Sequence, residues 1–322
     1  GICVKTDASN VFTKKLSDLD RDEWFAAMGK LGRKYGMYEK LGDKHAALLV
    51  DEGETLVVTF ETVEDIRDEN PGSEPLGFDL IRATGWSLLS VMSDGDTWFR
   101  DPKIYEFFDA LTDDGFFDGF DRIVFYGRGA CGYAAAAFSA AAPGSAVVAL
   151  SPQATLDPER ARWEQRFRTY RRLNFTDRYG YAPDMLEAAN DAYILFDSKR
   201  EEDAAHAALF KRDHVHLTRL PHASADLQID LLEAKVLYRL LARVGVEPLS
   251  SSGLGRMIRA RRIQVPYLRR VLLAVEETGN RQRTAKLARA ILQHVRMPIA
   301  RKRLSRLLED GIELPDPLKA EA

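Results

Sequence analysis

Short, nearly continuous apolar runs alternate with longer amphipathic stretches through the middle of the chain. The runs have the length and content of buried strands, and the stretches between them repeat apolar residues at helical spacing. The runs that predict strands are 45–50, 55–60, 86–93, 121–127, 145–152, 192–197 and 214–220. Strands that are apolar on both faces and separated by helices are typical of a mostly parallel sheet. We therefore predict a doubly wound α/β domain over residues 46–245.

The N-terminal part of the chain precedes this alternating pattern. Residues 1–45 are predicted to form a helical segment, because Trp24, Phe25, Met28 and Leu31 fall on one helical face. No strand is predicted before residue 45.

A helical appendage is predicted over residues 246–322. It opens with "EPLSSSGLG" (247–255), whose Ser, Gly and Pro content indicates a linker. Beyond the linker, residues 265–295 have the pattern of two amphipathic helices broken at "TGN", and residues 299–311 have that of a third.

The segment 157–190 is predicted to be a mostly helical, cap-like insertion in the α/β domain. Within it, "WEQRFRTYRRLNFTDRYGYAPD" (163–184) is dense in aromatic residues and arginines. The i, i+4, i+7 spacing of Trp163, Phe167 and Tyr170 predicts a helix face packed on the core. Rings interleaved with arginines also suit a surface that binds carbohydrate or phosphate, so both interpretations stand.

Charge is distributed unevenly, although the net charge of the 322 residues is only −3. Residues 51–121 hold nineteen acidic and four basic side chains, whereas residues 256–306 hold fifteen basic and two acidic ones. Such asymmetry indicates either an anionic partner for 256–306 or attraction between the two regions. We expect the basic appendage to serve partner binding or homo-oligomerisation.

The composition, 45% hydrophobic and 30% charged, is that of a globular protein. No apolar run approaches the roughly 18 residues that cross a bilayer, so no membrane span is expected. Cys3 and Cys131 do not make a disulfide framework, which fits a reducing cytoplasm. Neither belongs to a cluster with zinc-ligand spacing. A cytoplasmic protein without a metal site or cofactor is expected.

The segment "FYGRGACGYAAAA" (125–137) predicts a strand, a sharp Gly-rich turn and a helix. It contains the G-x-G-x-x-G pattern of dinucleotide-binding turns. However, it follows a late strand, and no acidic residue ends a strand about twenty residues further on, which argues against such a cofactor. A sulfonucleotide reductase is not supported either, because the C-terminal region holds no cysteine. The other common use of this turn is to lift a nucleophile above a sheet.

The stretch "YGRGACGYAAAAFS" (126–139) is similar to the "YGxSxGGYAAxxFA" nucleophile elbow of the α/β-hydrolase superfamily. The resemblance covers roughly residues 46–245 and implies the fold of that superfamily. It also implies that Gly127 is the first elbow glycine and that Gly129 occupies the position of the nucleophile. Cys131 stands where the family has another glycine.

The chain order of the family implies the other site residues. Its acid follows the next-to-last strand, which places Asp197 or Asp203 in that role, and its histidine follows the last strand, which points to His222. The resemblance implies further ligand contacts around the elbow and after the strand 55–60. These positions are Arg128, Ala130, Tyr133 and Thr62.

A glycine has no side chain to attack a carbonyl, so the serine mechanism cannot operate at Gly129. In the family the oxyanion loop follows the strand that corresponds to "LVVTF", which gives "ETVED" (61–65) here, and its carboxylates oppose the negative charge of an oxyanion. We predict a non-catalytic pseudoenzyme that binds a ligand or partner. The alternative is an active esterase or thioesterase that uses Cys131, or a water activated by His222.

Overall fold

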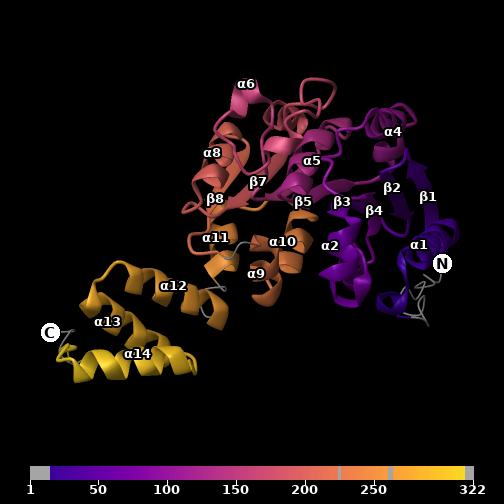
Figure 1. The fold of residues 1–322 in the computed structure, drawn as a ribbon. Coiled ribbons are helices and arrows are strands. Elements are labelled where there is room, and N and C mark those ends of the chain that lie inside the picture. Colours follow the sequence, from indigo (N-terminus) through magenta and orange to yellow (C-terminus); the bar gives the residue numbers. More distant parts are fainter. Residues whose placement is uncertain (1–14, 224–225, 260–263, 316–322) are drawn as a thin grey trace. The chain divides into compact units, whose positions relative to one another are not determined.

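The computed structural model describes residues 15–223, 226–259 and 264–315 (Figure 1). The chain divides into two compact units. Unit 1 consists of residues 1–219 and 238–249, and unit 2 of residues 220–237 and 250–322.

Unit 1 is built on one eight-stranded sheet with the order β1-β2-β4-β3-β5-β6-β7-β8. The strands are β1 (Gly36–Leu41), β2 (His45–Val50), β3 (Thr55–Thr62), β4 (Ser87–Ser93), β5 (Arg122–Arg128), β6 (Ala146–Leu150), β7 (Asp191–Phe196) and β8 (Val215–Arg219). Only β2 runs against its neighbours β1 and β4, and every other pair is parallel. The predicted doubly wound, mostly parallel sheet is confirmed.

Helices cover both faces of this sheet. Those of unit 1 are α1 (Arg21–Tyr35), α2 (Val63–Asp68), α3 (Gly77–Thr84), α4 (Pro102–Asp113), α5 (Ala130–Phe138), α6 (Pro158–Ala161), α7 (Ala182–Met185), α8 (Glu201–Leu209) and α10 (Leu237–Val244). In Figure 1, α4, α5 and α8 lie on one side of the sheet, and α2 and α10 lie on the other. Strands sandwiched in this way are apolar on both faces, as the sequence pattern requires.

Stacked aromatic rings fill the core between the sheet and the helices α4 and α5. Phe60 of β3 stacks on Phe108 of α4 and on Phe138 of α5, with ring centroids 5.8 Å apart in each pair. The start of α4 is fixed by the side chain of Asp101, which accepts a hydrogen bond from the Lys103 amide at 2.9 Å. These contacts anchor the α-helical layer above the carboxyl half of the sheet.

Three secondary-structure predictions are wrong. The segment 1–45 is not wholly helical, because β1 occupies 36–41 and pairs with β2. The amphipathic pattern of residues 224–245 predicts one helix after the strand 214–220, but the structure has two, α9 (Leu227–Glu233) and α10, separated at Lys235, which has φ +57°. The predicted linker 247–255 already contains the first turns of α11 (Ser251–Arg259).

The cap-like segment 157–190 also differs from its prediction. It contains only the short helices α6 and α7 and single 3₁₀ turns, among them η6 (Arg168–Tyr170), so no helix runs through Trp163 and Phe167. The regular spacing of its aromatic residues therefore does not reflect a helical face.

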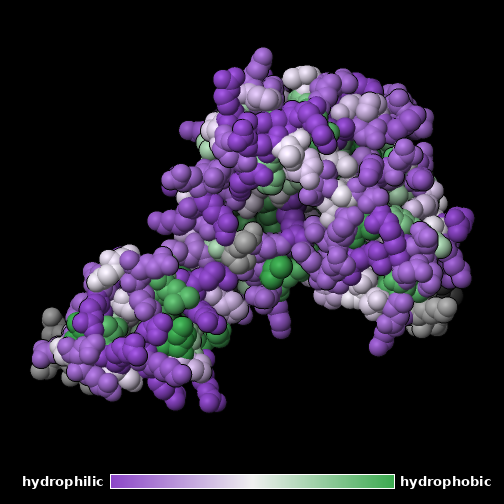
Figure 2. All heavy atoms as spheres, in the orientation of Figure 1, coloured by the Kyte–Doolittle hydropathy of each residue, from purple (hydrophilic) through white to green (hydrophobic). Residues whose placement is uncertain are grey.

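Unit 2 is helical throughout its described residues. Its helices are α9, α11, α12 (Val265–Glu277), α13 (Arg281–Leu292) and α14 (Pro298–Glu309). The predicted break between α12 and α13 is confirmed: Gly279 has φ +74°, and the side chain of Asn280 caps α13 by accepting from the Arg283 amide at 3.0 Å. Leu272, Ile291 and Met297 form the centre of a small core, and Figure 2 shows further hydrophobic residues on the surface of α12–α14.

None of the helices in the described parts of the chain is both long and apolar enough to cross a membrane.

Candidate functional site

The turn between β5 and α5 has an unusual backbone conformation at Gly129, with φ +56° and ψ −121°. Its amide donates a hydrogen bond to the Leu150 carbonyl at 2.8 Å, and its carbonyl accepts one from the Tyr133 amide at 2.9 Å. A glycine adopts a positive φ readily, whereas an L-residue in this conformation would be strained. The chain thus makes a sharp strand-to-helix turn whose apex is Gly129.

The glycine at position 127 allows β5 and α5 to approach closely. A Cβ on Gly127 would lie 2.1 Å from the Cys131 carbonyl oxygen, a backbone atom of α5. A Cβ on Gly132 would lie 3.1 Å from the Gly127 carbonyl oxygen and 3.2 Å from Cβ of Pro152. By contrast, a Cβ on Gly129 would have no heavy atom within 4 Å. The strand-to-helix turn is therefore tight at Gly127, and the space for a side chain at its apex, Gly129, is open.

The other residues of the elbow face the interior. Cys131 is only 5% exposed, and burial raises the pKa of its thiol well above the ordinary range. The thiolate, which is the nucleophilic form, is therefore disfavoured. Tyr133 is fully buried and donates its hydroxyl hydrogen to the Gly180 carbonyl at 2.6 Å. Ala130 is half-buried and begins α5.

The segment "ETVED" is not a loop in the structure. Glu61 and Thr62 end β3, and α2 begins at Val63. The Thr62 hydroxyl caps α2 by accepting from the Asp65 amide at 3.1 Å. Arg128 is bound by two carboxylates of this region, Asp65 at 3.1 Å and Glu69 at 2.7 Å. Thr62 and Arg128 thus both have structural partners here.

Glu61 is a buried carboxyl group at the end of β3, the strand that pairs with β5. Its two oxygens accept hydrogen bonds from the Leu76 amide at 3.0 Å and from the Asn70 side chain at 2.8 Å. Burial raises the pKa of Glu61 to about 7, although these hydrogen bonds act in the opposite direction. Near neutral pH this side chain is therefore partly protonated, and it carries less negative charge than the sequence suggests.

The two acid candidates are placed differently. Asp197 follows β7, and its Oδ1 accepts a hydrogen bond from the Lys199 amide at 2.8 Å. Because β5, β6 and β7 are adjacent and parallel, Gly129 and Asp197 both lie at the carboxyl ends of the strands. They are two strand spacings, or about 10 Å, apart. Asp203 is buried in α8 and forms an ion pair with Arg166 at 2.9 Å. Of the two, only Asp197 directly follows a strand, at the carboxyl ends of the strands where Gly129 also lies.

His222 comes three residues after the end of β8 and belongs to unit 2. It has φ +62°, and its carbonyl accepts a hydrogen bond from Arg270 Nε at 2.8 Å. Arg270 also pairs with the buried Asp230 at 2.9 Å. The role of His222 as a base toward position 129 stays a prediction.

A hydrogen-bonded network that the sequence did not reveal joins the cap-like segment to His206 of α8. Glu164 Oε2 lies 2.9 Å from His206 Nε2 and 2.8 Å from Arg166 Nη2. His206 Nδ1 accepts from the Ala154 amide at 3.1 Å, so the proton of the neutral ring is on Nε2, facing Glu164. Burial alone would raise the pKa of Glu164, but the hydrogen bonds from His206 and Arg166 outweigh it and lower that pKa to about 2.

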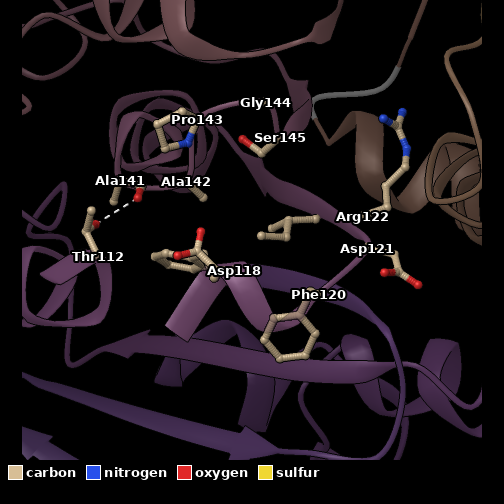
Figure 3. Close-up of a pocket in the computed structure, with 12 residues that line it drawn as sticks. Thr112, Asp118, Phe120, Asp121, Arg122, Ala141, Ala142, Pro143, Gly144 and Ser145 are labelled. Atoms are coloured by element: carbon tan, nitrogen blue, oxygen red, sulfur yellow. Dashed lines mark hydrogen bonds between the residues drawn. The ribbon is translucent and has the colours of Figure 1, made fainter. Parts of the chain in front are cut away.

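A cavity of about 340 Å³ lies at the amino ends of the strands, opposite to the end where Gly129 lies (Figure 3). It is lined by residues before β5 and β6, including Arg122 and Ser145. The Thr112 hydroxyl at its wall donates to the Ala141 carbonyl at 2.7 Å, and Arg122 pairs with Asp191 at 3.0 Å. Because it lies at the amino ends of the strands, this cavity is not part of the elbow site. Among the described residues, no three His, Cys, Asp or Glu side chains are grouped so as to hold a metal ion.

The strand order, the single antiparallel strand β2 and the sharp turn after β5 together decide the fold. The fold is α/β-hydrolase-like. No protein-family model matches the chain, and no curated protein is similar to it in sequence.

Solved structures similar to the chain include esterases and an acetyltransferase. Est1E from Butyrivibrio proteoclasticus is 17% identical with a TM-score of 0.44, and the match covers 66% of this chain and 99% of that one. Carboxyl esterase 2 from Tuber melanosporum is 17% identical with a TM-score of 0.42, over 63% of this chain and 81% of that one. The capsule O-acetyltransferase of Neisseria meningitidis serogroup A is 11% identical with a TM-score of 0.42, over 64% and 92%. Likeness at this level says nothing about substrate or mechanism.

Proposed function

We propose that this protein is a non-catalytic, hydrolase-fold binding protein whose elbow has kept its shape without a nucleophile. The observation that carries the proposal is Gly129, which combines φ +56° with open space where a side chain would project. A triad enzyme that lacks its serine retains only about 10³–10⁴-fold acceleration over water. A protein in this state acts by binding rather than by turnover.

The surroundings of Gly129 support this proposal over the alternative of a cysteine hydrolase. Cys131 is two residues past the apex, buried, and held as a thiol by its raised pKa. The positive charge of Arg128 is already neutralised by Asp65 and Glu69, so it is not available to a developing oxyanion.

Ester hydrolysis tests the proposal directly. A panel of short-chain p-nitrophenyl esters and thioesters is assayed with the wild type, Gly129→Ser, Gly129→Ala and Cys131→Ala. Gly129→Ala is the matched control for Gly129→Ser, because it introduces the same backbone strain without a hydroxyl group. The wild type and Gly129→Ala are expected at the buffer rate, and Gly129→Ser above it. Turnover by the wild type that Cys131→Ala abolishes would overturn the proposal.

Unit 2 supports a second role, the binding of an anionic partner. Among its described residues between 256 and 306, only Arg270, Arg281 and Arg303 form ion pairs, with Asp230, Asp310 and Glu276. Exposed side chains of this stretch that make no ion pair with the described residues, such as Arg256, Arg269 and Lys302, keep their charge available at the surface. Retention of the full chain on an anionic resin, compared with a Lys302→Gln variant across a salt series, measures this contribution. Sedimentation at two ionic strengths tests the expected homo-oligomer.

A further inference from the structure

Trp163 is the one aromatic among the large hydrophobic side chains exposed on the described residues, at 40% exposed. The spacing of the cap-like segment predicts that it packs on the core together with Phe167 and Tyr170. Those two do pack, with ring centroids 5.2 and 4.6 Å from Trp98. Trp163 instead remains at the surface, although exposing an indole ring forgoes the free energy of its burial.

The exposed ring is held in place by buried groups. On one side it contacts the ring of the fully buried His206, with the centroids 4.6 Å apart. The backbone on both sides of it is fixed by Arg171, whose Nη2 donates to the Arg162 carbonyl at 2.7 Å and to the Glu164 carbonyl. Glu164 is in turn anchored to His206 at 2.9 Å. Trp163 is therefore presented in one orientation, which lowers the entropic cost of stacking a ligand on it.

Arginines without a carboxylate partner surround this turn. Arg162, Arg168 and Arg172 are exposed, and none of them makes an ion pair with any residue that the structure describes. Because Arg171 bonds to the Arg162 and Glu164 carbonyls, Arg172 and the preceding turn η6, which begins at Arg168, are close along the chain to a residue that is fixed to the Trp163 turn. Figure 2 shows mainly hydrophilic residues around α6, the helix that this turn follows. The surface joins one stacking ring to several uncompensated positive charges.

We propose that Trp163, with Arg162, Arg168 and Arg172, forms a binding site for a phosphorylated nucleoside, either free or within a single strand. The base stacks on the free face of Trp163, and the guanidinium groups bind the phosphate oxygens. Stacking on an aromatic ring and bidentate contacts from arginine are the two interactions by which such ligands are held. The inference goes beyond the proposed function, because the Trp163 site does not include Gly129.

The first test measures affinity by calorimetry with the full-length protein. The probes are AMP, a single-stranded oligo(dA) of about ten nucleotides, and ribose 5-phosphate, which has the sugar and the phosphate of AMP but no base. We expect AMP and oligo(dA) to bind and ribose 5-phosphate to bind more weakly. Trp163→Ala is expected to weaken the binding of both nucleotide probes about tenfold, whereas Trp163→Phe, which keeps a ring, changes it much less. Affinity that rises with strand length identifies a strand as the ligand, and equal affinity identifies a free nucleotide.

The second test locates the site. All four tryptophans of the sequence lie in unit 1, and Trp24 and Trp98 are buried, so a base stacked on Trp163 quenches fluorescence while binding to unit 2 leaves it unchanged. Absence of binding by AMP and oligo(dA), or equal binding by wild type and Trp163→Ala, would overturn the inference. Binding of heparin in place of nucleotides would also overturn it, in favour of an anionic glycan.

Separate experiments test nucleotide binding at Trp163 and the absence of catalysis at Gly129, so either proposal can be overturned without the other. Gly129→Ser is expected to bind nucleotides like the wild type, because position 129 is not part of the Trp163 site. An esterase-active wild type would overturn the proposed function and leave the Trp163 result unaffected.

Discussion

Two glycines of the elbow are expected to differ sharply when each is replaced by alanine. At Gly127, the three atoms nearest to the new Cβ belong to the backbone of α5, and the first lies at 2.1 Å. No side chain can move aside, so β5 and α5 must separate. The expected loss in free energy of unfolding is on the order of 4 kcal/mol, above the usual cost of overpacking of about 1–3 kcal/mol, because only backbone atoms could move.

At Gly129 the new Cβ meets nothing within 4 Å. The cost is then only the strain of φ +56° and ψ −121°, about 1–3 kcal/mol, reduced by the lower entropy of the unfolded chain. We therefore expect Gly129→Ala to lose about 1–2 kcal/mol, at least 2 kcal/mol less than Gly127→Ala.

Urea unfolding followed by tryptophan fluorescence measures both values, because all four tryptophans report on unit 1. The reasoning would be refuted if Gly127→Ala were as stable as the wild type. It would equally be refuted if Gly129→Ala were as damaging as Gly127→Ala, since the apex would then not be open.

Three further predictions concern stability. Glu164→Gln is expected to lower the stability of unit 1 by about 3 kcal/mol at pH 7 and by less at pH 2, because the pKa of Glu164 is lowered and its stabilisation is lost as pH falls through about 2. The pKa of Glu61 is raised in the folded protein, so its contribution to the free energy of unfolding is largest below pH 4.5, and about 3 kcal/mol of that free energy is lost as pH rises through 7. Glu61→Gln is expected to flatten this pH dependence, measured by urea unfolding at several pH values. Leu272→Ala in the core of unit 2 is expected to cost 2–5 kcal/mol, measured as faster hydrogen exchange in α12–α14.

Much of the sheet was predictable because its strands are continuous apolar runs. The exception is β1, whose sequence "GMYEKL" is mostly exposed at the edge of the sheet and lacks such a run. The break before α10 could not be predicted either. The amphipathic pattern of 224–245 continues through Lys235, and only the positive φ of Lys235 in the structure interrupts the helix.

The strand, turn and helix over 125–137 were predicted from the glycines, but the different roles of these glycines were not. Sequence alone does not distinguish Gly127, which the helix contact requires, from Gly129, whose apex is open. The partners of the polar residues were also hidden, because Glu164 and His206 are 42 residues apart and meet only in the folded chain. The spacing of Trp163 imitated a buried helix face, and the turn held by Arg171 exposes it instead.

The central claim is that the elbow has kept its shape and lost its nucleophile. Its most direct test is intact-mass analysis after incubation with a fluorophosphonate, which labels activated nucleophiles covalently. We predict that the wild type stays unmodified and that Gly129→Ser gains one adduct that maps to position 129. A stoichiometric adduct on the wild type would contradict the account, because it would reveal a nucleophile that works without a side chain at Gly129.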